Sequence, residues 1–287
     1  MLKNNKIIVI GAGGYIGAQL YESAQKKGYR TLGTTSSGSD LMRKFRLDLP
    51  EEFDYSDICR NDVVLFSAAI SAPDICSNEF SKAWTANVTG TSLFIRRAID
   101  RGARVIFFSS DTVYGAKTNL FDESAECNPA GGYAQMKREV ELKFVGEDNF
   151  KSIRLSYVFS KSDNFTKYLV DCVNKQQRAE IFHPFLRSVV HRDDVVEGVL
   201  ALAIRWDEFQ EKILNFGGPE VLSRIEFAES IRNVFRINSN FKIIEPGEEF
   251  FSNRPRVISM KSPVFPRLLG RAPRTLREAT KIEFASP

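Results

Sequence analysis

The chain has 287 residues, of which 43% are apolar and 26% charged, and its formal net charge is +4. It is long enough for one large core, and no run reaches the ~20 apolar residues of a membrane-spanning helix. Four cysteines without CxxC pairing and only two histidines argue against a disulfide framework and a zinc site. No signal-peptide pattern precedes the first strand. We therefore expect a reduced, cytoplasmic protein that holds no metal.

The first predicted element is a buried parallel strand, Ile7–Ile10, which leads into a glycine-rich turn and a helix. The helix is indicated by Ile16, Leu20 and Tyr21 at helical spacing. Glycines keep the turn free of side chains, so that backbone N–H groups and the helix N-terminus can approach a pyrophosphate. Its spacing is GxxGxxG, and an ordinary tight turn is the alternative. The cofactor residues predicted here are Gly11, Gly13, Gly14, Tyr15, Ile16 and Gly17.

The second predicted strand, Tyr29–Gly33, is followed by a loop of hydroxyl residues with no acid before Asp40. NAD-specific sites place an acid after this strand to hold the ribose 2′-OH. Hydroxyls with a cation nearby, such as Arg43 or Lys44, suit a 2′-phosphate instead. We therefore expect NADP(H), with NAD as the alternative cofactor. The other interpretation is a plain Ser/Thr loop that contacts no cofactor. The residues predicted to bind the cofactor in this loop are Thr34, Thr35 and Ser36.

A helix is predicted over 133–144, and Tyr133 and Lys137 share one of its faces because they are four residues apart. A phenol has a pKa of about 10 and is a poor acid–base catalyst at neutral pH. A nearby ammonium and a positive nicotinamide ring would lower that pKa. Ser110, at the end of the preceding strand, can hold a substrate oxygen beside Tyr133. This pattern predicts hydride transfer at an alcohol or ketone carbon; a surface helix with a chance YxxxK is the alternative.

Strand-like runs alternate with helical ones over the first two-thirds of the chain, which predicts an α/β fold with a doubly wound parallel Rossmann sheet. We expect a dinucleotide-binding domain over 1–160. Residues 161–287 should form a mixed region that completes the sheet and builds a small substrate lobe. The predicted strands are Ile7–Ile10, Tyr29–Gly33, Val63–Ala68, Arg104–Ser109 and Ser152–Val158. Later predicted elements are a helix at 167–174, a strand at 188–190, a helix at 194–204 and a strand at 213–218.

Taken in order, these motifs resemble the extended short-chain dehydrogenase/reductase family, or NAD-dependent epimerase/dehydratase family, over nearly the whole chain. The segments 154–160 and 163–165, together with Asp111, are most similar to the dTDP-4-dehydrorhamnose reductase-like branch. The resemblance implies that Ser110, Tyr133 and Lys137 are catalytic. The further cofactor contacts that it implies are Asp48, Ser67, Ala68, Ala69, Asn87, Ser109 and Lys137.

The same resemblance implies that Arg187 and Arg254 converge on the diphosphate of a nucleotide sugar, where guanidinium groups make charge-assisted contacts. Residues 254–277 are basic and contain no acid, but aromatic interleaving and a nucleic-acid-binding fold are missing. The expected partners are thus a small-molecule nucleotide sugar and a second copy in a homodimer, without nucleic acid or membrane. The expected substrate residues are Ser110, Asp111, Thr112, Tyr133, Asn164, Arg187 and Arg254.

The residues after the catalytic hydroxyl bear on the reaction. Dehydratases of this family carry an Asp-Glu pair there, whereas this chain has Asp111-Thr112, which disfavours dehydration. Galactose-type epimerases stay open, because Ser110 and Thr112 meet their hydroxyl-x-Thr pattern. Reduction of a 4-keto group on a nucleotide-linked sugar needs only the three catalytic residues, and it is the predicted function. An epimerase, another carbonyl reductase of this fold and a non-catalytic NADP-binding regulator are the alternatives.

Overall fold

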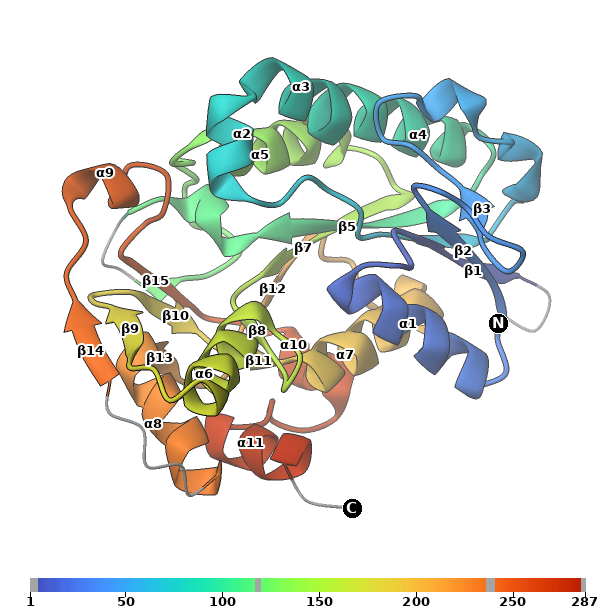
Figure 1. The fold of residues 1–287 in the computed structure, drawn as a ribbon. Coiled ribbons are helices and arrows are strands. Elements are labelled where there is room, and N and C mark those ends of the chain that lie inside the picture. The colour runs from blue at the N-terminus through green and yellow to red at the C-terminus, as the bar shows by residue number, and fades with distance from the viewer. Residues whose placement is uncertain (1–4, 117–119, 236–240, 285–287) are drawn as a thin grey trace.

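A parallel sheet of seven strands forms the centre of the molecule (Figure 1), and it confirms the predicted doubly wound α/β fold. The computed structural model describes residues 5–116, 120–235 and 241–284. The strand order is β12-β7-β5-β4-β1-β2-β3. After β1 the chain adds β2 and β3 on one side of it, and then β4, β5, β7 and β12 on the other side. The point between β1 and β4 is therefore the topological switch point, where a doubly wound sheet opens a ligand-binding crevice. The strands are β1 (Lys6–Ile10), β2 (Arg30–Thr35), β3 (Arg43–Lys44), β4 (Val63–Phe66), β5 (Arg104–Ser110), β7 (Phe150–Leu155) and β12 (Ile213–Phe216).

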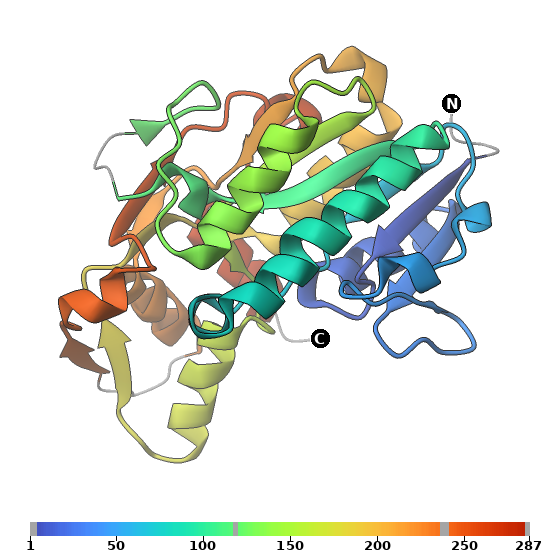
Figure 2. The ribbon, with the colours of Figure 1, turned by 90° about the horizontal axis from the view of Figure 1, so that it is seen from above.

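Helices cover both faces of this sheet, as Figures 1 and 2 show, with α4 and α5 on one face and α1 and α7 on the other. Strand β1 divides accordingly: Ile7 and Val9 pack with α1 and α7, and Ile8 and Ile10 with α4 and α5. Burial on both faces explains why the strand reads as one continuous apolar run. The helices around the sheet are α1 (Tyr15–Lys26), α2 (Pro73–Asn78), α3 (Phe80–Trp84), α4 (Thr91–Asp100), α5 (Gly132–Phe144), α7 (Arg192–Ile204) and α10 (Phe265–Leu269).

The remaining elements build a smaller lobe, with strand order β13-β10-β15-β6 in its largest sheet. Residues after 160 contribute to both parts, because β12 pairs with β7 of the main sheet. Within the described ranges, no helix has the length and apolar character needed to cross a bilayer.

The lobe strands are β6 (Leu120–Phe121), β8 (Val158–Phe159), β9 (Ala179–Phe182), β10 (Leu186–Ser188), β11 (Val190–His191), β13 (Val221–Ser223), β14 (Phe241–Ile244) and β15 (Val257–Met260). The lobe helices are α6 (Asn164–Asn174), α8 (Arg224–Phe235), α9 (Glu248–Phe251) and α11 (Leu276–Phe284). Short 3₁₀ turns lie at η1 (Pro50–Glu52), η2 (Tyr55–Asp57), η4 (Asp111–Tyr114) and η5 (Trp206–Glu208), and a π turn at η3 (Thr85–Gly90).

The predicted strand Ser152–Val158 is wrong at its C-terminal end, because β7 ends at Leu155 and β8 pairs with β11 in a separate sheet. Two side chains at the break explain it. Ser156 Oγ donates to Asp111 Oδ2 at 2.9 Å, and the Tyr157 hydroxyl donates to Asp163 at 2.6 Å. These contacts turn the chain away from the sheet and toward the crevice.

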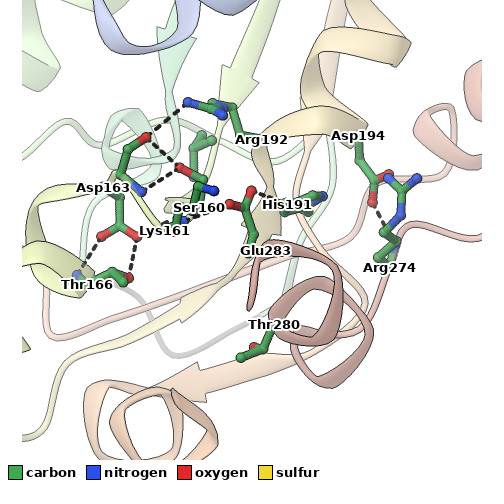
Figure 3. Close-up of polar contacts among 12 residues, drawn as sticks. Ser160, Lys161, Asp163, Thr166, His191, Arg192, Asp194, Arg274, Thr280 and Glu283 are labelled. Atoms are coloured by element: carbon green, nitrogen blue, oxygen red, sulfur yellow. Dashed lines mark hydrogen bonds and ion pairs between the residues drawn. The ribbon is translucent and has the colours of Figure 1, made fainter. Parts of the chain in front are cut away.

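The basic segment 254–277 meets carboxylates from other parts of the chain. Arg254 Nη2 lies 2.6 Å from Asp74 Oδ2, and Arg271 Nη2 lies 2.7 Å from Asp194 Oδ1. Arg274 bonds the same Asp194 (Figure 3). Pairing of these arginines therefore removes much of the positive charge that the sequence concentrates there.

A buried ion pair fastens α5 to β7. Arg154 Nε donates to Glu141 Oε1 at 3.0 Å, and its Nη2 donates to Oε2 at 2.8 Å. The two residues are 1% and 0% exposed. Burial alone would raise the pKa of Glu141, but the hydrogen bonds and charge of Arg154 outweigh it, so that the pKa is lowered. The carboxylate is thus held ionised inside the protein.

We expect Glu141→Ala to lower the free energy of unfolding by about 3–5 kcal/mol at pH 7, because it leaves Arg154 buried without its anion. Urea unfolding measures this. The control is Glu139→Ala on the same helix, whose exposed pair with Lys143 (3.5 Å) contributes ~0.5 kcal/mol or less.

The pH dependence has a defined sign. Because the pKa of Glu141 is lowered on folding, its contribution is complete above the unfolded value of about 4.3. It disappears as the pH falls through the lower folded value, so wild type and Glu141→Ala should converge in acid. An equal loss of stability in both glutamate variants at pH 7 would contradict this account.

Candidate functional site

The glycine-rich turn leaves no room for side chains at its centre. Gly11 has φ +90°, and a Cβ on Gly17 would lie 2.1 Å from the Gly11 carbonyl oxygen. The N-cap of α1 is Gly14, which has no side chain that could cap the helix. The first turn of the helix carries no acid. The first N–H groups of α1 therefore face outward at the positive end of the helix dipole, which suits a phosphate.

A cavity of about 780 Å³ opens beside this turn. It lies at the carboxyl ends of β1, β2, β4 and β5, at the point where strand order reverses. The sequence-predicted cofactor residues that the structure places on its wall are Gly11, Gly13, Gly14, Tyr15, Ile16, Gly17, Thr34, Thr35, Ser36, Asp48, Ser67, Ala68, Ala69, Ser109 and Lys137.

Asn87 is the predicted cofactor residue that lies behind this wall. It is 3% exposed, and its side chain accepts from the Ile70 N–H and donates to the Ile70 carbonyl oxygen, both at 2.8 Å. Ile70 itself lines the cavity. Asn87 therefore shapes the loop that borders the cavity, and it does not face the space itself.

The cations after β2 do not lie where the sequence suggested. Arg43 pairs with Asp57 at 2.9 Å, and Lys44 lies 3.8 Å from Glu52. Neither cation lines the first cavity, whereas Arg46 does. Sequence reasoning missed Arg46, because the loop geometry that turns it inward is not a local pattern.

Asp48, which the family resemblance implied as a cofactor contact, lies on the same wall as Arg46. Arg46 Nη2 donates to Asp48 Oδ2 at 2.6 Å, and this contact lowers the pKa of Asp48. The carboxylate lines the cavity together with its partner. The pair therefore presents a cation and an anion side by side, with little net charge.

A second cavity, of about 1020 Å³, adjoins the first. The two share part of their walls, including Tyr15, Ser71 and Tyr133. The tyrosine ring thus borders both spaces. The predicted substrate residues on the wall of the second cavity are Ser110, Asp111, Thr112, Tyr133, Asn164, Arg187 and Arg254.

Three consecutive side chains are tied together beside Tyr133. Thr112 Oγ1 donates to Ser110 Oγ at 2.9 Å, and Ser110 Oγ lies 3.3 Å from Asp111 Oδ1. Ser156 Oγ donates to the other Asp111 oxygen. Burial raises the pKa of Asp111, although Arg187 and the hydroxyl bonds oppose it. The Ser110 hydroxyl is therefore held in place from both sides.

Lys137 is buried below Tyr133, with its Nζ 5.6 Å from the tyrosine ring centre. The Nζ donates to the Phe108 carbonyl oxygen at 2.7 Å. Burial lowers the pKa of Lys137 to about 7. Burial also raises the pKa of Tyr133, reinforced by the negative charges of Cys76 and Asp111.

The sequence predicted a lowered phenol pKa from the combined effect of Lys137 and a nicotinamide ring. From the protein groups alone the shift is upward, because burial penalises the phenolate and the interactions with Cys76 and Asp111 add to that penalty. With its pKa lowered to about 7, Lys137 also carries only part of its positive charge at neutral pH, which is less than the sequence suggested.

Arg187 does not point freely into the second cavity. It is 6% exposed, and its Nη2 and Nη1 donate to the Pro255 and Leu186 carbonyl oxygens, both at 2.6 Å. Its Nε lies 3.7 Å from Asp111 Oδ2. Arg254, on the same wall, donates to Asp74. The two expected diphosphate ligands are thus both engaged with protein groups.

Two further arginines on this wall, Arg192 and Arg224, escaped the sequence analysis. Arg192 donates to Ser162 Oγ at 3.0 Å. Arg224 is the first residue of α8 and stands in no motif. No sequence signal could have singled it out, because its position depends on how the lobe folds over the sheet.

The chain matches the family model of the RmlD substrate binding domain over residues 5–283. It is 23% identical over 287 residues to dTDP-4-dehydrorhamnose reductase of Aggregatibacter actinomycetemcomitans, covering 98% of this chain and 92% of the relative. It is also 23% identical over 277 residues to methionine adenosyltransferase 2 subunit beta of Bos taurus, covering 89% and 80%. Among solved structures, MoeE5 in complex with UDP-glucose and NAD superposes with a TM-score of 0.82 at 20% identity, covering 97% of each chain. This last likeness is one of fold.

We expect Gly17→Ala to abolish measurable dinucleotide binding and to lower the melting temperature, because the added Cβ would collide with the Gly11 backbone. Titration of intrinsic or NADPH fluorescence measures the affinity. The matched control is Gly146→Ala, where an added Cβ meets nothing within 4 Å. Binding that survives in Gly17→Ala as in the control would show that the turn does not hold the dinucleotide.

Proposed function

The chain belongs to the RmlD substrate-binding domain family, within the extended short-chain dehydrogenases/reductases, and we propose that it reduces the 4-keto group of a nucleotide-diphosphate-linked sugar with NADPH. It is an NAD(P)-dependent enzyme of that class. The observation that carries the proposal is the position of Tyr133 on the wall shared by two adjoining cavities. One cavity has the walls of a dinucleotide site, and the other gathers hydroxyls and arginines.

The glycine turn and the N-terminus of α1 fit a pyrophosphate, because a Cβ at Gly17 would fill the space against the backbone. In the proposed reaction the nicotinamide supplies the hydride. Lys137 would hold the nicotinamide ribose, and Ser109 borders the same space. Ser110, steadied by Thr112, holds the ketone oxygen from the second cavity. Tyr133 donates the proton to that oxygen.

Protonation favours the reductive direction. A phenol is neutral at pH 7 and burial raises the pKa of Tyr133 further, so this side chain begins the reaction with a proton to give. An enzyme that must first oxidise its substrate, as an epimerase does, needs the phenolate at that step. Thr112 stands where a dehydratase of this family carries Glu, so this chain does not have the Asp-Glu pair that dehydration uses.

Cofactor choice follows from the residues around β2. Thr35 and Ser36 line the first cavity, and Arg46 stands on the same wall. Hydroxyls and a guanidinium can bind a ribose 2′-phosphate, whereas the acid that would hold a 2′-OH is missing at the end of this strand. Asp48 is the nearby carboxylate, and Arg46 already pairs with it. These features support NADP(H).

We expect Tyr133→Phe to lower kcat by ~10²–10⁴, the usual contribution of a general acid. The dissociation constant for NADPH should stay close to that of wild type, because the ring remains. Steady-state NADPH oxidation with dTDP-, UDP-, GDP- and CDP-linked 4-keto sugars measures the first quantity, and fluorescence titration the second. The control, Tyr168→Phe, removes a hydroxyl that contacts Glu180 outside both cavities. Turnover in Tyr133→Phe within a few-fold of this control would refute the assignment.

We expect wild type to bind NADPH more tightly than NADH, and Thr35→Asp to reverse that order. The new carboxylate would accept the 2′-OH of NADH and repel the 2′-phosphate of NADPH. Thr35→Asn, which has the same shape without the charge, separates repulsion from steric change. A wild-type preference for NADH would rule out the cofactor proposal and leave the reductase proposal standing.

A further inference from the structure

Arg224 occupies an unusual place on the wall of the second cavity. It is the first residue of α8, directly after β13, and lines the cavity together with Arg187 and Arg254. Its guanidinium carbon lies 4.8 Å from the ring centre of Phe165 and 4.7 Å from that of Phe185. The two rings therefore hold the planar group and remove much of its hydration.

The Arg224 guanidinium has no anionic partner in the part of the chain that the structure describes. Among the described residues, no carboxylate lies within ion-pair distance of Arg224, and no hydrogen bond from its side chain is found. Its nitrogen atoms are nevertheless not sealed inside the protein, since the residue is only partly buried and borders the cavity. Free donors directed at an open space require either water or a ligand.

Asp163 is the carboxylate whose charge reaches Arg224, but its oxygens are occupied (Figure 3). Oδ1 accepts from the Tyr157 hydroxyl at 2.6 Å and from the N–H groups of Phe165 and Thr166. Oδ2 accepts from Thr166 Oγ1 at 2.6 Å. Asp163 caps α6 with these bonds, and it therefore cannot turn to pair with Arg224.

The neighbouring arginines increase the need for an anion. Burial lowers the pKa of Arg224, and the positive charge of Arg254 lowers it further against the opposing effects of Tyr157 and Asp163. Burial also lowers the pKa of Arg187 to about 10; Asp111 opposes this shift and Arg224 adds to it. The three guanidinium groups therefore act on one another, and only Arg187 and Arg254 have carboxylate partners of their own.

We propose that Arg224, together with Arg254, binds the diphosphate of the substrate, and that Arg187 stays bound to Asp111 as part of the wall. This inference rests on the proposed nucleotide-sugar function and changes which arginine the diphosphate meets. Arg254 lies toward the rim, where its partner Asp74 is 65% exposed, so an incoming phosphate can replace that carboxylate. Arg187 cannot be released as easily, because Asp111 would be left buried without its cation.

The test compares ligands that differ only in phosphate. Binding of dTDP and thymidine, and of UDP and uridine, is measured by calorimetry for wild type, Arg224→Met and Arg224→Lys. We expect Arg224→Met to weaken nucleoside diphosphate binding by about 10- to 100-fold, as for a lost charged hydrogen bond. Nucleoside and NADPH affinities should not change. Arg224→Lys should recover part of the loss, since the charge returns without the fork of donors.

Arg232→Met is the matched control, because Arg232 lies on the same helix and stacks on a phenylalanine, Phe241, at 5.6 Å. It does not line the second cavity. This variant should bind all four ligands as wild type does. Melting temperatures of every variant, measured alongside, show whether the lobe remains folded.

The outcomes separate the two proposals. If wild type binds a nucleoside diphosphate and Arg224→Met binds it equally well, the Arg224 inference is overturned and the proposed function stands. If Arg224→Met weakens nucleoside and diphosphate alike, the residue supports the cavity wall and contacts no phosphate, which also overturns the inference. If wild type binds neither dTDP nor UDP, GDP and CDP are titrated in the same way; when none of the four binds, the nucleotide-sugar function itself fails, and the inference with it.

Discussion

The arrangement of this site depends on how α5 is held against the sheet. Tyr133, Lys137 and Glu141 follow one another at intervals of four residues, so that they share one stripe of the helix. At its far end the stripe is bonded to Arg154 on β7, and in its middle Lys137 bonds the Phe108 carbonyl oxygen on β5. A rotation of the helix would break both contacts. The third member of the stripe, Tyr133, is thereby fixed on the wall between the cavities.

The strand beside α5 divides its residues between the same two spaces. Ser109 lines the first cavity and Ser110 the second, although they are neighbours at the end of β5. Successive side chains of a strand point to opposite sides, so the two residues border different spaces, although the Ser109 hydroxyl oxygen itself is buried. The end of β5 and one face of α5 thus contribute to the walls of both cavities, and on β5 the two contributions come from adjacent residues.

Burial shifts the pKa values of the groups around Tyr133. It raises the pKa values of the phenol and of Asp111, and it lowers that of Lys137. Neighbouring groups of opposite charge offset part of the cost of burying a charge, as Arg187 does for Asp111. Arg224 departs from this rule, since aromatic rings pack against it and no carboxylate of the described residues lies within ion-pair distance. A site that leaves one cation uncompensated is prepared for an anion from outside.

The sequence by itself determined the parts of this protein that depend on spacing along the chain. Continuous apolar runs indicate strands covered on both faces, glycines at fixed intervals indicate a turn without side chains, and a four-residue spacing places Tyr133 above Lys137. Each of these is a property of one strand, turn or helix. The predicted strand at 152–158 failed at the point where Ser156 and Tyr157 bond residues from other segments. Partners that distant leave no local pattern.

Only the tertiary structure decided which charged side chains are available to a ligand. Arg46 faces the first cavity while Arg43 and Lys44 pair elsewhere, and Asn87 supports a loop from behind it. In the second cavity Arg187 is held by Asp111, whereas Arg224 has no such partner among the residues that the structure describes. The reason is physical: a charge in a protein is free or bound according to the groups that folding brings within a few ångströms. Those groups come from segments far apart in the chain.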